Sequence, residues 1–94
     1  MNDTTTITRQ MTLCNKRGLH ARAAARFAAT AEQFESDIEV SFDERCVNGK
    51  SIMGLMMLAA ACGKTIEVTG RGADADQAVE AIAKLVGARF HESE

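Results

Sequence analysis

Apolar and polar side chains alternate along three short stretches of the chain. An apolar side chain at every second position is typical of a strand that buries one face and exposes the other. The stretches are residues 7–14, 38–43 and 65–69, with apolar side chains at Ile7, Met11, Leu13, Ile38, Val40, Phe42, Ile66 and Val68. Asp43 and Glu44 favour a turn into a fourth short strand at residues 45–47, and Gly70 and Gly72 are expected to end the last strand. The pattern therefore predicts four strands.

Three other stretches carry apolar residues at helical spacing. We expect helices over residues 21–34, 52–58 and 75–86, because Ser51 and Asp74 can act as N-caps and Gly63 can end the second helix in a left-handed cap. The buried positions expected in the first and third helices are Ala24, Phe27, Ala28, Ala31, Phe34, Ala78, Val79, Ile82, Leu85 and Val86. The second helix is apolar around its whole circumference, so it predicts some exposed apolar surface.

The order strand, helix, strand, strand, helix, strand, helix indicates the α+β class. We predict an open-faced β-sandwich, in which a four-stranded antiparallel sheet carries three helices on one face. Neither a linker nor an internal repeat interrupts residues 1–94, which are expected to form a single domain. A chain of this length has room for one core, and this excludes an enzyme with separate catalytic and substrate domains.

Charge and composition argue against nucleic acid and membranes as partners. Eleven Lys and Arg against thirteen Asp and Glu give a net charge of −2, and all of the aromatic residues, 4% of the chain, are Phe. A nucleic-acid binder usually carries a basic surface or an aromatic platform for bases, so nucleic acid is not an expected partner. The chain shows no signal peptide and no apolar run of bilayer-spanning length, so we expect a cytoplasmic protein without membrane insertion.

The three cysteines do not suggest a metal site. Cys14, Cys46 and Cys62 form no close pair, so neither a disulfide framework nor a zinc knuckle is indicated, and we expect three reduced side chains acting as small apolar fillers. A small metal-carrying domain of similar element order is disfavoured because the first loop has no paired cysteines.

The loop before the first helix holds the clearest candidate chemistry. Gly18 can adopt a positive φ, which places His20 at the helix entrance beside the first unpaired backbone N–H groups. A helix N-terminus favours an anion by about 0.3–1 kcal/mol and disfavours the imidazolium, so a neutral, nucleophilic ring is expected. Arg22 can reach the same space with a fork suited to phosphate, and Lys16, Arg17 and Arg26 add cations.

These features suggest a group, most naturally phosphate, that is held covalently and passed on. On spacing alone, however, a histidine that only caps a helix beside solvated arginines is the more common arrangement. His91 stands in a polar tail and is expected to be solvated.

Two motifs in register resemble the HPr family, the histidine-containing phosphocarriers of the phosphoenolpyruvate-dependent phosphotransferase system. They are the run Gly18, Leu19, His20, Ala21, Arg22 and the run from Val47 to Gly54. The resemblance implies that Nδ1 of His20 accepts a phosphoryl group from enzyme I and passes it to an enzyme IIA domain, with Arg22 accompanying the phosphohistidine and Gly18, Ala21 and Arg17 supporting the phosphate site. It implies no cofactor and a carrier that is not itself an enzyme.

The second motif implies regulation and docking. Ser51 would be the target of an ATP-dependent HPr serine kinase/phosphorylase, and Ile52, Met53 and Met56 would contact partners. The family pattern normally has a proline where this chain has Ala23, which puts transfer rates or partner preference in question.

The alternative function is a regulatory protein-binding module of the same fold, for example in a nitrogen-linked phosphotransferase branch, with its phosphorylation state as the signal. The choice between that branch and sugar transport stays open at this point. The protein is expected to be a monomer.

Overall fold

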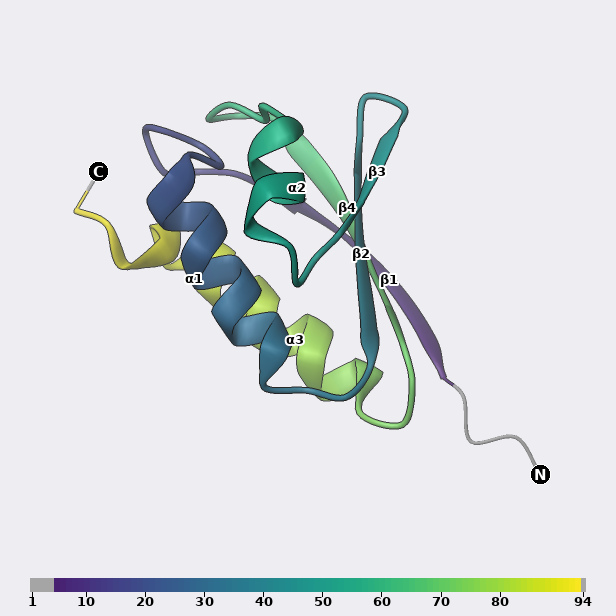
Figure 1. Cartoon of the computed structure of the whole chain (residues 1–94). Helices are drawn as coiled ribbons and strands as arrows, with labels where there is room; N and C mark the ends of the chain where they lie inside the picture. The colour runs from purple at the N-terminus through teal and green to yellow at the C-terminus, as the bar shows by residue number, and fades with distance from the viewer. Residues whose placement is uncertain (1–4, 94) are drawn as a thin grey trace.

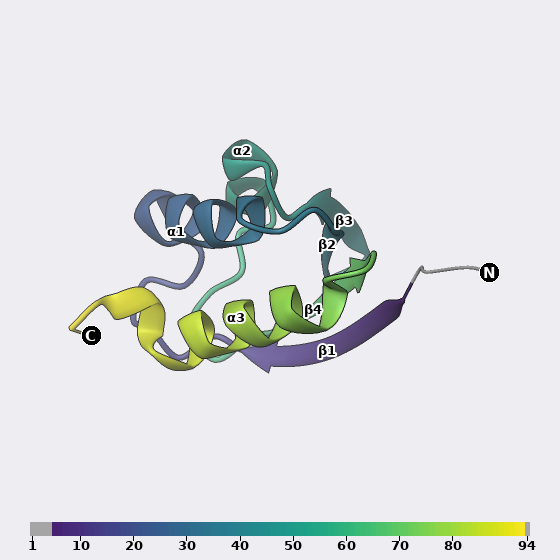
Figure 2. The same cartoon turned by 90° about the horizontal axis from the view of Figure 1, so that it is seen from below.

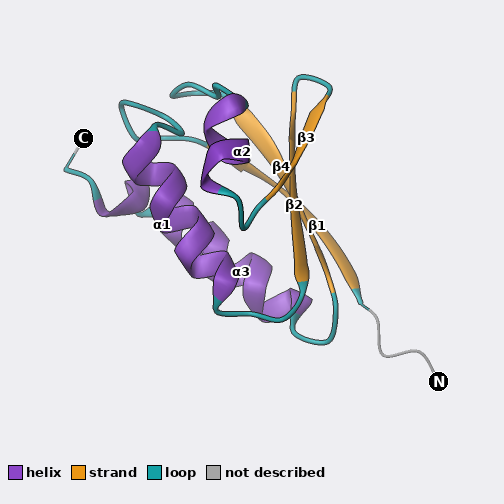
Figure 3. Cartoon of the chain, in the orientation of Figure 1, coloured by secondary structure: helices purple, strands orange, loops and turns teal. Residues whose placement is uncertain are grey.

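A twisted antiparallel sheet and three helices make up the fold. The structure, a computed structural model, describes residues 5–93. The sheet runs in the order β1-β4-β2-β3, and all of its neighbouring strands are antiparallel (Figures 1 and 3). Its strands are β1 (Thr6–Thr12), β2 (Asp37–Phe42), β3 (Arg45–Asn48) and β4 (Thr65–Arg71).

The helices lie together on one side of this sheet, as the view from below shows (Figure 2). They are α1 (Ala21–Glu32), α2 (Ile52–Met57) and α3 (Ala75–Gly87), followed by a 3-10 turn, η1 (Arg89–His91). The predicted open-faced sandwich is therefore confirmed. None of the helices in the described part of the chain is long and apolar enough to cross a membrane.

The core lies between the sheet and the helices, where the predicted alternation and helical spacing bring the apolar side chains together. From the strands come Met11, Ile38, Val40, Ile66 and Val68, and from the helices Ala24, Phe27, Ala28, Ala31, Leu55, Ala78, Val79, Ile82, Leu85 and Val86. Phe90 of η1 is also fully buried, which fixes the C-terminal segment, residues 89–93, against the domain. Phe34 lies just beyond the end of α1 and is only partly buried.

The end of α2 differs from the prediction. The helix stops at Met57, and the residue with positive φ that follows its end is Ala59, with φ 54°, rather than Gly63. Buried Leu58 and Ala60 on either side hold this turn against the core. Gly63, with φ 88°, belongs to the turn that leads into β4. Gly70 does not end β4 but lies within it, between Ile7 and Ile38 of the flanking strands.

Asp74 begins α3 without capping it through its side chain, contrary to the expected N-cap bond. Its carboxylate instead accepts hydrogen bonds from the backbone N–H groups of Glu35 and Ser36, both at 3.0 Å, and from the Ser36 hydroxyl. Ser36 is buried, so its polar groups need these partners. Asp74 thereby ties the loop between α1 and β2 to the start of α3.

The cysteines are free, as predicted, but they are exposed and do not fill the core. Each lies near an element end or on an edge strand, where the chain meets solvent. Residues 5–93 hold no group of three His, Cys, Asp or Glu side chains that could bind a metal ion.

Candidate functional site

The loop between β1 and α1 presents His20 through a glycine turn. Gly18 has φ 61°, and its N–H donates to the Asn15 carbonyl at 3.1 Å. A Cβ at this position would lie 2.4 Å from the carbonyl oxygen of Ala60, so no other residue fits the turn unchanged. The next residue, Leu19, is buried and donates its N–H to that same carbonyl at 2.9 Å. Gly18 therefore has the positive φ expected from the sequence, and Leu19 anchors the loop.

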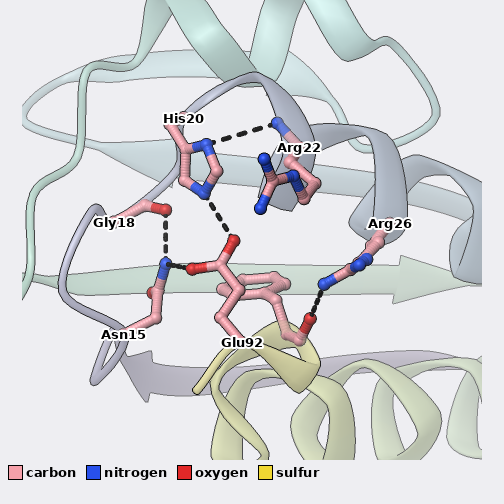
Figure 4. A network of polar contacts seen from close by, with 7 residues as sticks. Asn15, Gly18, His20, Arg22, Arg26 and Glu92 are labelled. Atoms are coloured by element: carbon pink, nitrogen blue, oxygen red, sulfur yellow. Dashed lines mark hydrogen bonds and ion pairs between the residues drawn. The ribbon is translucent and has the colours of Figure 1, made fainter. Parts of the chain in front are cut away.

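His20 is the N-cap of α1, in an extended conformation with φ −76° and ψ −179°. Its Nδ1 accepts a hydrogen bond from the backbone N–H of Arg22 at 3.4 Å, and its Nε2 lies 2.5 Å from Oε2 of Glu92 (Figure 4). An ionised carboxylate only accepts hydrogen bonds, so this contact selects the uncharged tautomer in which Nε2 carries the proton and Nδ1 keeps its lone pair. In that tautomer the nucleophilic nitrogen faces the positive end of α1.

Glu92 is held in place from two sides. Its Oε1 accepts a hydrogen bond from Nδ2 of Asn15 at 3.1 Å, and the same Nδ2 donates to the Gly18 carbonyl at 2.8 Å. Burial alone would raise the pKa of the Glu92 carboxyl. Hydrogen bonds from Asn15 and His20, with the charges of His20 and Arg22, outweigh burial and hold that pKa below its usual value. Glu92 is therefore a carboxylate at neutral pH.

Sequence reasoning missed Glu92 because residues 88–94 read as a polar tail. The only signal was Phe90, a large apolar residue between charged and polar neighbours. Its burial, with the hydrogen bond that Arg26 donates to its carbonyl, brings the C-terminal segment to the entrance of α1 (Figure 4).

A cationic pocket of about 440 Å³ opens beside Glu92, the partner of His20, where the C-terminal segment meets α1. Its walls contain four cationic side chains and three residues of the C-terminal segment: Lys16, Arg17, Arg22, Arg26, His91, Glu92 and Ser93. The guanidinium of Arg22 forms no hydrogen bond or direct ion pair with another residue in the range 5–93, and Arg22 is exposed. The pocket can therefore offer a planar donor to an anion, and it includes Arg17 and Arg22, whose roles at a phosphate stay predictions.

Ala21 and Ala23 bracket the start of α1. Ala21 is the first helical residue and is exposed, whereas Ala23, which stands where the family pattern has proline, is completely buried. The helix begins at Ala21 without a proline to fix its first turn.

The second motif forms the start of α2. The Ser51 hydroxyl accepts a hydrogen bond from the Gly54 N–H at 3.0 Å, so the predicted N-cap is confirmed. The helix packs beside α1 (Figure 1). It leaves a group of apolar side chains exposed. We call this group the α2 surface: Ile52 (43% exposed), Met53 (73%), Met56 (43%) and Met57 (68%).

The His20 loop touches the chain just after α2, through the bond from Leu19 to Ala60, whereas Ser51 lies at the other end of the helix. The two predicted phosphorylation sites are thus not brought into one site. They flank the same helix.

Comparisons with known proteins agree along almost the whole chain. Residues 7–88 match the family described as "PTS HPr component phosphorylation site". The chain is 46% identical over 89 residues to phosphocarrier protein NPr of Shewanella violacea, covering 95% of this chain and 98% of the relative. It is 51% identical over 82 residues to phosphocarrier protein HPr of Neisseria meningitidis, covering 87% and 92%. The crystal structure of HPr from Bacillus anthracis superposes with a TM-score of 0.84 at 41% identity, covering 87% of this chain and 98% of that one.

Proposed function

This chain belongs to the HPr family of phosphocarriers, and we propose that it accepts a phosphoryl group on Nδ1 of His20 from enzyme I and passes it to an enzyme IIA domain. Family members work within the phosphotransferase system as carriers and not as enzymes. The observation that carries the proposal is the orientation of His20. Its Nδ1 accepts from the first turn of α1, while Glu92 occupies Nε2.

The geometry suits a transient phosphohistidine. When the Nδ1 lone pair bonds to phosphorus, the phosphoryl oxygens replace it as acceptors for the N–H groups at the start of α1. Arg22 and Arg17 line the adjoining pocket and can pair with the same oxygens. A carrier must not hold phosphate too firmly, because each 1.4 kcal/mol of excess stabilisation shifts the onward equilibrium about tenfold. A half-buried ring with exposed arginines meets that need.

Partners would dock on the α2 surface beside the His20 loop. Ile52, Met53 and Met56 are exposed there, and flexible methionine side chains adapt to partners of different shape. Replacing Met53 by serine should therefore raise the carrier concentration needed for half-maximal transfer. The exposed Cys46 on β3, replaced by serine, is the matched control and should leave transfer unchanged. Equal transfer by both variants would show that Met53 does not contribute to docking.

Ser51 is the proposed regulatory site. A phosphate there would add nearly two negative charges at the start of α2, next to Ile52 and Met53, and would weaken docking to an acidic partner while the helix persists. With ATP and an HPr serine kinase, we expect one acid-stable phosphate that Ser51→Ala abolishes. A phosphate that persists in Ser51→Ala would move the regulatory site elsewhere.

The regulatory alternative shares the same phosphohistidine. Relatives named HPr and NPr are both phosphocarriers, so they support the carrier chemistry without selecting a branch. The two functions differ in the onward step, since a carrier is discharged rapidly by a cognate enzyme IIA whereas a signalling module keeps its label until a target binds. The cytosolic location and the monomeric state stay predictions.

The test of the carrier function is labelling by phosphoenolpyruvate and enzyme I. Intact mass should show a single phosphoryl group that acid removes, and His20→Ala should show none. His91→Ala is the matched control, because His91 is an exposed histidine in the cationic pocket next to Glu92. Absence of label on the unmodified protein, or label on His20→Ala, would refute the proposal.

A further inference from the structure

We propose that Glu92 is a positioning residue, which holds the proton on Nε2 of His20 and so keeps Nδ1 as the nucleophile. This inference rests on the proposed carrier function and deepens it. Its starting point is the 2.5 Å contact between Nε2 and Oε2 of Glu92, a pair whose side chains are 21% and 10% exposed. A neutral imidazole exchanges its proton between two nitrogens, and a carboxylate beside one of them selects the tautomer.

The carboxylate is itself fixed, as a positioning role requires. Asn15 is fully buried and its Nδ2 binds both Glu92 and the Gly18 carbonyl, so one amide links the carboxylate to the glycine turn that presents the ring. Because both partners of Nδ2 are acceptors, the amide orientation is unambiguous. Two residues before Glu92, buried Phe90 anchors the C-terminal segment, and Arg26 donates a hydrogen bond to the Phe90 carbonyl. Glu92 is thus fixed through its own carboxylate and through the backbone that carries it.

The second nitrogen of the ring fits the same tautomer. Nδ1 lies 3.4 Å from the backbone N–H of Arg22, which can only donate, so Nδ1 must offer its lone pair. With the proton on Nδ1 instead, the Arg22 N–H would face another donor. The Glu92 carboxylate would then face the lone pair of Nε2. Both contacts would then be lost. The site therefore favours the reactive tautomer from both sides of the ring.

This arrangement removes proton transfer from the reaction. The Nδ1 lone pair forms the bond to phosphorus while the bond between phosphorus and the donor protein breaks, and that electron pair leaves with the donor. The Nε2 proton stays in place, so the phosphorylated ring carries a positive charge, which the Glu92 carboxylate balances. Onward transfer reverses these changes and returns the neutral ring with its Nε2 proton. No general base is needed in either direction.

The experiment compares Glu92→Gln with Glu80→Gln in the full chain. A glutamine oxygen can accept from Nε2, but its amide group then faces the Asn15 amide donor, so the variant loses the charge and one of two contacts. The matched control is Glu80 on α3, an exposed carboxylate that pairs with Arg9 of β1. The ¹⁵N shifts and long-range ¹H–¹⁵N correlations of His20 measure the tautomer, and single-turnover labelling by phosphorylated enzyme I measures transfer.

We expect Glu92→Gln to lower the Nε2–H fraction of His20 and to slow transfer by about tenfold, the lower end of the effect seen when the carboxylate behind a metal-bound histidine is removed. Glu80→Gln should change neither quantity. An unchanged tautomer in Glu92→Gln overturns the inference, whether or not transfer slows, because slower transfer alone would indicate a structural role. If the unmodified protein accepts no phosphoryl group, the carrier function fails, and the tautomer measurement still decides what Glu92 does to the ring.

Discussion

Replacing Phe90 by alanine should detach the C-terminal segment from the site while the rest of the domain stays folded. Arg89, Phe90 and His91 are all left-handed, with φ of 57°, 54° and 63°. That conformation costs an L-residue roughly 1–2 kcal/mol, or about 3–6 kcal/mol for the three together. The segment keeps this shape because Phe90 is completely buried.

The magnitudes decide the outcome. Truncating a buried phenylalanine to alanine withdraws about 3–5 kcal/mol, which is close to the cost of the left-handed turn. In Phe90→Ala the cost of the left-handed turn is no longer offset by the burial of the phenyl ring, so releasing the segment becomes favourable. Because release also relieves the strain, the free energy of unfolding should fall by less than about 3–5 kcal/mol. Glu92 leaves His20 when the segment is released.

Amide hydrogen exchange and guanidinium denaturation measure these two effects. The N–H groups of His91 and Glu92 donate to the Ala88 and Arg89 carbonyls at 2.9 Å, and both should lose protection in Phe90→Ala. Phe42→Ala is the matched control, since Phe42 packs at the edge of the core on β2 and should lower stability without exposing these amides. Retained protection of both amides in Phe90→Ala would refute the reasoning.

Three further predictions follow from single contacts. Gly18→Ala places a Cβ 2.4 Å from the Ala60 carbonyl oxygen, so we expect a lower melting temperature and slower labelling of His20. Unchanged values of both would contradict the requirement for glycine in this turn. Ser51→Ala should cost about 1 kcal/mol in denaturant unfolding, whereas Ser51→Asp retains a capping oxygen and should cost little; equal losses would exclude the cap. Asp74 has a pKa below its usual value, mainly through the Ser36 hydroxyl, so it stabilises the fold above about pH 4 and less below it. The stability gap to Asp74→Asn, followed by urea unfolding against pH, should therefore shrink on acidification, and a gap that widens would contradict this role.

The sheet and helices could be predicted because their patterns are local. Alternation at Ile38, Val40 and Phe42, and helical spacing at Ala78, Val79 and Ile82, reflect which side of one element faces the core. Gly18 and Ser51 were also predictable, since each satisfies a requirement of the backbone next to it.

The missed features depend on contacts between distant parts of the chain. Asp74 looks like an N-cap from its neighbours, yet it serves Ser36, 38 residues away. Glu92 reaches His20 across 72 residues, and its role depends on the burial of Phe90. The exposed Cys46 on the edge strand β3 shows a related limit, because composition alone does not say which side of an edge strand faces solvent.

The central claim is that Nδ1 of His20 carries the phosphoryl group. The most direct measurement is a long-range ¹H–¹⁵N spectrum of uniformly ¹⁵N-labelled protein, recorded after phosphorylation by enzyme I and phosphoenolpyruvate and read for coupling to ³¹P. We predict coupling to Nδ1 of His20, with a proton retained on Nε2. Coupling to Nε2, or to a nitrogen of His91, would contradict the account.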